Sequence, residues 1–156
     1  MPQTSIASAP AAAYAGQLGD PGTDAYAVTG LAEDALTAGQ PVLRGTDPAR
    51  QAKAIPDGAT VDETTLLGWA LLDTTRPYDA ADPIEAGDSV AVLRRGRVWV
   101  KTSAAVTAGN PVYVGNATAQ LGDIADATGV GLTLCPGARF ATSTSGAGLA
   151  LVEVNL

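Results

Sequence analysis

Short apolar runs separated by turn-forming residues recur along most of the chain. From residue 25 onward, stretches rich in Val and Leu alternate with clusters of Gly, Pro, Asp and Asn. Runs of this length, bounded in this way, are typical of strands. Their spacing predicts an all-β fold, either a small β-barrel or a jelly-roll-like sandwich. The predicted strands are residues 25–28, 41–44, 66–73, 89–93, 97–102, 111–114, 130–134 and 148–154.

The segments between these strands carry little apolar pattern. Only residues 47–54 (DPARQAKA) have a composition that favours a helix, of one or two turns at most. Residues 57–65 and 74–83 are polar and contain several Asp, Thr or Pro residues, so both are predicted to be loops.

The first 24 residues differ from the rest. Ala, Pro, Ser and Gly dominate them and apolar periodicity is absent, so they bury too little surface to offset the entropy of ordering them alone. We expect residues 1–24 to form an extended N-terminal arm ahead of a single β domain, residues 25–156. Two interpretations of the arm are open: a disordered tail, or a segment that orders against a neighbouring subunit.

A sequence repeat lies within the β pattern. Residues 37–45 read TAGQPVLRG and residues 107–115 read TAGNPVYVG, while a weaker copy, EAGDSVAV, covers residues 85–92. Each copy has a glycine that tolerates positive φ, and the two clear copies place a proline where a strand begins. Each clear copy is later followed by an apolar run opened by glycine, residues 68–72 and 131–134. One interpretation is a turn type that recurs in any β protein; the other is an internal duplication within a barrel.

Residues 85–102 (EAGDSVAVLRRGRVWVKT) carry the clearest local signal. Two apolar strands flank residues 94–97, where Gly96 permits a tight turn, so a β-hairpin is predicted. Alternation in its second strand places Val98 and Val100 on one face, with the side chains at positions 97, 99 and 101 on the other.

The predicted hairpin gathers positive charge on an acidic chain. Four of the nine basic residues lie in it, around a tryptophan. One interpretation is a solvated tip whose charges protect a strand edge from aggregation. The other is a contact patch for an acidic partner surface. With two apolar residues of the arm, these residues form the predicted partner-binding set: Tyr14, Leu18, Arg94, Arg95, Arg97, Trp99 and Lys101.

Composition indicates assembly. Aromatic residues make up 4% of the chain, and small apolar residues take their place, so the apolar area buried per residue is small. Burial against partners would stabilise such a subunit further. The strands predicted at residues 97–101 and 148–154 are expected to offer edges for association. Copies of the chain itself are therefore expected partners, with a trimer favoured over a dimer.

Several functions are disfavoured by what the sequence lacks. Its 16 acidic and 9 basic residues give a net charge of −7, which argues against nucleic-acid binding. There is no histidine, so the commonest general base and zinc ligand are missing. The single cysteine, Cys135, has no partner for an internal disulfide and is predicted to be a buried apolar residue at a strand end. No apolar run approaches the ~18 residues that span a bilayer, so no membrane contact is expected, and the N-terminus lacks the pattern of a signal peptide.

No catalytic residue, cofactor site or metal site is predicted. The Gly-rich segment 142–148 (TSTSGAG) lacks the lysine and spacing of a phosphate-binding loop. Acidic pairs occur at positions 62/63, 79/82 and 123/126, but none carries the full ligand series of a calcium loop. The chain is therefore predicted not to be an enzyme.

Four segments, taken in order, resemble phage structural cement proteins. They are AYAGQLGDPG in the arm, LRRGRVWV in the predicted hairpin, AGNPVYVG in the second repeat copy and PGARFATSTSGAGLALVEV near the C-terminus. The ordered set carries the resemblance, since no single segment is diagnostic. The resemblance implies a barrel or sandwich subunit on the outside of a tailed-phage capsid, made in the host cytoplasm, that clamps neighbouring major capsid proteins without catalysis.

Two other functions fit parts of the pattern. A receptor- or carbohydrate-binding module of a phage particle needs an aromatic platform, for which only Trp69, Trp99 and the tyrosines are present. A small β-barrel nucleotide hydrolase has subunits of similar length but needs acidic and phosphate-binding motifs that this sequence does not show.

Overall fold

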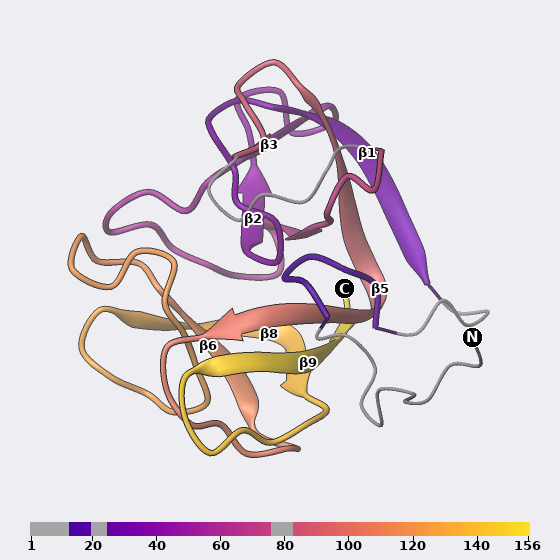
Figure 1. Ribbon diagram of the computed structural model, residues 1–156. Helices are drawn as coiled ribbons and strands as arrows, with labels where there is room; N and C mark the ends of the chain where they lie inside the picture. The colour runs from indigo at the N-terminus through magenta and orange to yellow at the C-terminus, as the bar shows by residue number, and fades with distance from the viewer. Residues whose placement is uncertain (1–12, 20–24, 76–82) are drawn as a thin grey trace, which may run out of the picture.

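The structure, a computed structural model, describes residues 13–19, 25–75 and 83–156. Within these ranges all the regular elements are β-strands, which confirms the predicted all-β class, and the strands join in one continuous sheet (Figure 1). The strands are β1 (Tyr26–Ala32), β2 (Pro41–Arg44), β3 (Gln51–Lys53), β4 (Leu66–Ala70), β5 (Ser89–Thr102), β6 (Pro111–Gly115), β7 (Ile124–Ala125), β8 (Leu132–Phe140) and β9 (Gly148–Asn155).

The first half of the sheet closes into a barrel. Strands β1, β3, β2, β4 and β5 follow one another, and β1 also pairs with β5, which completes the ring. The β1–β3 pairing is parallel and the other pairings in this ring are antiparallel. The barrel, and not the jelly-roll-like sandwich, is therefore the architecture that the sequence pattern encodes.

Strand β5 continues from this barrel into a second ring of strands. Its first part pairs with β1 and β4, and residues 95–102 pair with β9. From β9 the order is β8, β6 and β7, and the N–H of Ser103, just after β5, donates to the carbonyl of Ile124 in β7 at 3.3 Å. Figure 1 shows the two rings one above the other, with β5 running from the upper into the lower.

The prediction of a hairpin over residues 85–102 is wrong. Residues Ser89–Thr102 form one strand, because β1 and β9 pair with successive parts of it. The register with β1 shifts so that Arg94 is the extra residue of a β-bulge. The basic residues therefore lie in the middle of a strand and not at an exposed tip.

Gly96 serves close packing in place of the predicted turn. Its φ is +125°, which L side chains rarely adopt, and a Cβ there would lie 3.2 Å from the Cα of Ala25. A glycine within an apolar run is typical of either a tight turn or a bulged, closely approached strand. The local sequence does not separate these two uses.

Other boundaries also differ from prediction. Residues 47–54 contain a turn followed by β3 and no helix, and β7 falls where no strand is predicted. The strand predicted at residues 130–134 is the start of β8, which continues to Phe140. The predicted loop 57–65 contains no strand, while most of the predicted loop 74–83 lies outside the described residues.

The sequence repeat corresponds to a structural duplication. The N–H of Gly39 donates to Ala70 at 2.8 Å, and seventy residues later the N–H of Gly109 donates to Phe140 at 2.7 Å. Each glycine has a positive φ and precedes a strand, β2 or β6. The equivalent of residues 68–72 is accordingly 138–142, which begin in the last part of β8 and end just after it, and not 131–134. Further equivalent contacts are Leu36 with Ile84 and Val106 with Thr144, and Pro41 opposite Trp69 and Pro111 opposite Arg139.

The two barrels pack against each other through β4. Every residue of β4 is buried: Leu67 and Ala70 belong to the small cluster inside the first barrel, whereas Leu66 and Trp69 join the larger cluster that fills the second. A strand with barrels on both faces needs apolar residues on both, so its sequence, LLGWA, does not alternate. Trp69 is fully buried between the barrels.

Candidate functional site

The described part of the arm lies beside the basic residues of β5, although the two were singled out separately in the sequence. Residues 13–19 run along the edge of β5 opposite β9, with Leu18 antiparallel to Val98. This segment therefore adds a short strand to the second ring. Three backbone hydrogen bonds hold it: the N–H of Gly16 donates to Trp99 at 2.7 Å, the N–H of Trp99 to Gln17 at 2.9 Å and the N–H of Gly19 to Arg97 at 2.9 Å.

The same segment also contacts the first barrel. The N–H of Leu72, just after β4, donates to the carbonyl of Gly16 at 2.9 Å. Gly16 has a φ of +81°, and a Cβ on it would lie 2.7 Å from the Cβ of Ala38 and 2.9 Å from the nitrogen of Gly39. Only glycine fits this position. Because Gly16 forms hydrogen bonds with both Trp99 and Leu72, it joins the two barrels. Sequence reasoning missed it, although the Gly-rich composition of the arm was a signal.

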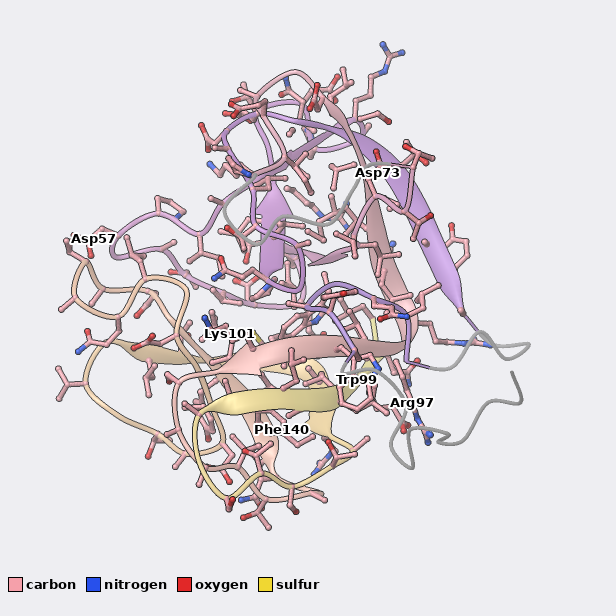
Figure 2. All side chains as sticks on the ribbon, viewed as in Figure 1. Asp57, Asp73, Arg97, Trp99, Lys101 and Phe140 are labelled. Carbon is pink, nitrogen blue, oxygen red and sulfur yellow. The ribbon has the colours of Figure 1, made fainter. Side chains whose placement is uncertain are left out.

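Alternation along the second half of β5 is confirmed. Val98 and Val100 are fully buried, while Arg97 and Lys101 are exposed and Trp99 is partly buried. Figure 2 shows the labelled side chains of Arg97, Trp99 and Lys101 in succession along this strand. The outer face of β5 thus carries two cations on either side of an indole.

The positive charge of this face is partly neutralised. The guanidinium of Arg97 lies 3.2 Å from the carboxylate of Glu153 on β9, and both side chains are about half exposed (46% and 58%). Exposed pairs of this kind contribute little to stability. Lys101 has no ion-pair partner within residues 13–19, 25–75 and 83–156. Lys101 is therefore the exposed cation of the predicted set that forms no ion pair with the described residues.

The remaining predicted contact residues divide into exposed and enclosed. Arg95 is exposed, but Arg94, at the bulge, is only partly exposed and its buried Nε has no hydrogen-bond partner among the described residues. Tyr14 is 47% exposed, whereas Leu18 is partly buried against the larger core cluster. Arg95 and Tyr14 therefore lie at the surface, whereas much of Leu18 packs within the chain itself.

We call the outer face of β5 with the segment beside it the arm–β5 surface. It comprises Tyr14, Arg95, Arg97, Trp99 and Lys101. Four of these residues lie on β5, and Tyr14 lies two residues before the segment 16–19 that pairs with this strand. A partner surface with acidic and apolar groups would complement it.

Asp126 and Cys135, two of the side chains that could have pointed to a metal or reactive site, make contacts within the fold. In the described part of the chain, no three His, Cys, Asp or Glu residues gather as a metal site would require. Asp126 accepts from the N–H of Thr107 and from Asn110, in the second repeat turn. The pair at positions 79/82 lies outside the described residues. Burial in β8 raises the pKa of the Cys135 thiol to about 12, so it stays protonated, within the strand and not at its end.

The Gly-rich segment at 142–148 also has a structural use. The hydroxyl of Thr142 accepts a hydrogen bond from the N–H of Leu151 at 2.8 Å, and Thr144 exchanges backbone hydrogen bonds with Val106. These contacts connect the segment to β9 and to the second repeat turn.

No helix in the described ranges is long and apolar enough to cross a bilayer.

Comparison with known proteins identifies the class. The family described as structural cement protein (E217 gp24/Pam3 gp6) matches residues 1–155. The chain belongs to this family: it is a non-enzymatic cement, or decoration, protein of a tailed-phage capsid.

Two solved phage structures are similar to this chain to different degrees. A chain from the capsid of Myoviridae phage XM1 has a TM-score of 0.74 at 18% identity, with 98% of this chain and 96% of that chain covered. The head fiber gp8.5 N base of bacteriophage phi29 has a TM-score of 0.46 at 12% identity, over 83% of this chain and 93% of that chain. No curated protein matches the chain.

Proposed function

We propose that this cement protein binds major capsid protein subunits through the arm–β5 surface and stabilises the contacts between them. The supporting observation is the strand pairing of residues 16–19 with Arg97 and Trp99, which joins the arm to the basic strand. A pairing held by backbone hydrogen bonds fixes residues 16–19 along the edge of the strand that carries Arg97 and Lys101. Preorganised surfaces of this kind lose less entropy on binding.

The test uses one charge reversal and a matched control. Lys101→Glu changes an exposed lysine on the arm–β5 surface, and Lys53→Glu makes the same change on β3 of the first barrel. Capsids prepared without this protein are incubated with each variant, and bound protein is measured after sedimentation. We expect Lys101→Glu to lower the apparent affinity several-fold, and added salt to weaken the wild type, because charges at an interface act through a screened field.

Lys53→Glu should bind capsids like the wild type. Both variants should unfold near the wild-type temperature, since Lys101 is exposed, Lys53 is partly exposed and charges in such positions contribute little to folding. Equal capsid binding by Lys101→Glu and wild type at low salt would remove β5 from the contact. The arm and the loops would then be the surfaces left to test.

We further propose that the subunit associates with copies of itself on the capsid. The sequence favours a trimer over a dimer and points to edges at residues 97–101 and 148–154. In the structure these two segments pair with each other, and their outer edges pair with the arm and with β8. Neither is a free edge, so self-association needs another surface.

A further inference from the structure

Among the described residues, the duplication leaves one strand edge without a neighbour, whereas its counterpart is covered. β1 in the first barrel corresponds to the second half of β5 in the second, since seventy residues separate Ala27 from Arg97 and Thr29 from Trp99. In the second barrel this edge bonds to residues 16–19. In the first barrel, the described residues place no strand against the same part of β1.

The backbone groups of Ala27 and Thr29 point out of this edge. Ala91 lies opposite Thr29, but its carbonyl accepts from Leu71 on the β4 side, so the Thr29–Ala91 pair exchanges no hydrogen bonds. Further along β1, the N–H of Leu31 already points outward and donates to Arg50 at 2.8 Å. Among described residues, the outward N–H and C=O groups of positions 27 and 29 have no partner.

The sequence of β1 gives this edge no protection against pairing. YAVTGLA contains no charged residue and no proline, which are the usual devices that keep edge strands apart. Both large apolar side chains near its ends are exposed, Tyr26 at 57% and Leu31 at 48%. An uncharged, exposed edge of this length is typical of a site that another strand covers.

We propose that β1 pairs with β1 of a second copy of the chain, antiparallel about a two-fold axis at Val28. The inference rests on the proposed self-association but not on where the capsid is contacted. Each copy has a net charge of −7, so a contact that brings charged surfaces of two copies together is disfavoured; β1 carries no charged residue and avoids this cost at the contact itself. An isologous contact of this kind closes as a dimer, which replaces the trimer favoured by sequence.

Hydrogen-bond parity supports this register. With Val28 on the axis, Ala27 lies opposite Thr29 of the second copy, and Thr29 opposite Ala27. All four residues then direct their N–H and C=O groups toward one another, as hydrogen-bonded pairs of antiparallel strands do. Tyr26 lies opposite Gly30 of the second copy, where an aromatic ring covers a glycine across the strands.

Complementary charges provide the test. Two variants are made, Ala27→Lys with Thr29→Lys, and Ala27→Glu with Thr29→Glu; both positions are exposed. In the proposed register, like charges then lie opposite each other at both pairs. We expect the dimer dissociation constant, measured by sedimentation equilibrium, to rise about tenfold or more for each variant alone. An equimolar mixture should recover it to within a few-fold of wild type.

A matched control places two lysines at Ala104 and Ala105, which are exposed in the second barrel and change net charge equally. This control should dimerise like wild type. Undiminished association of the charged variants, no recovery on mixing, or a wild type that is monomeric in solution with β1 strands apart on the capsid would each overturn the proposal. Capsid binding is measured separately, so loss of decoration with intact dimerisation would count against the proposed function alone.

Discussion

At the scale of single residues, polar side chains in this protein stabilise turns. The carboxylate of Asp62 accepts hydrogen bonds from the N–H groups of Thr64 and Thr65 and from the hydroxyl of Thr64, immediately before β4. These bonds, with the Thr64 hydroxyl foremost, lower the pKa of Asp62 to about 2 from 3.8. The acidic pair at positions 62/63 is therefore explained by a turn and not by a ligand.

Asp62→Ala should make the melting temperature depend less on pH as the pH falls from about 4 toward 2. Since the pKa is lowered in the folded state, the stabilisation is present above pH 4 and is lost as the pH falls toward 2. We expect the variant to melt a few degrees below wild type at neutral pH, and the two melting curves to converge near pH 2. Glu63→Ala, a neighbouring exposed carboxylate, is the control and should melt like wild type at both pH values. A constant difference between Asp62→Ala and wild type across this range would contradict the assignment.

At the scale of elements, the arm segment is a structural part of the second ring as well as a candidate contact. Gly16→Ala should displace the arm segment for two reasons. The positive φ of this position is strained for alanine, and the added Cβ would clash with Ala38 and Gly39. Gly58→Ala is the matched control, since Gly58 has a similar φ of +71° but open space around it. The control should cost about 1–2 kcal/mol of unfolding free energy from backbone strain alone.

Gly16→Ala should cost at least about 1 kcal/mol more than the control, since the hydrogen bonds to β5 weaken with it. Hydrogen exchange of the Trp99 amide, which donates to Gln17, should accelerate in Gly16→Ala and stay unchanged in Gly58→Ala. Equal costs and equal protection of Trp99 in the two variants would show that the segment contributes nothing to holding β5.

The sequence predicts individual elements better than their partners. The β2 and β6 strands are found because a glycine turn, a proline and a Val run coincide, and that same local signal reveals the duplication. The hairpin prediction at β5 is wrong because a glycine within an apolar run, such as Gly96, is typical of both a tight turn and a bulged strand. Which edges are covered depends on long-range pairing. The local sequence therefore reveals neither the pairing of β5 with β9 nor the edge of β1 that no described residue covers.

The predicted contact residues show the same limit. Alternation correctly places Arg97, Trp99 and Lys101 on an outer face, since only local geometry is involved. It does not reveal that Arg94 is enclosed at a bulge or that Glu153 lies beside Arg97, because both depend on neighbouring strands. Trp69, a possible part of an aromatic platform in sequence, lies fully buried between the barrels.

At the scale of the whole molecule, two duplicated barrels share one long strand and are joined again by the arm. This double connection orients the barrels relative to each other, as a cement subunit that contacts several neighbours would require. Trp69 is fully buried, so Trp99 is the one of the two tryptophans with exposed surface. An aromatic platform for sugars would need more exposed rings, which weakens the carbohydrate-binding alternative.

The most direct test is to image capsids made with and without this chain at a resolution that traces strands. We expect density for both barrels on the outer capsid surface, touching at least two major capsid protein subunits, with the arm–β5 surface at the contact. The same density should be missing from particles that lack the chain. Identical capsid surfaces in the two preparations, or density for the chain only on the tail, would contradict the account.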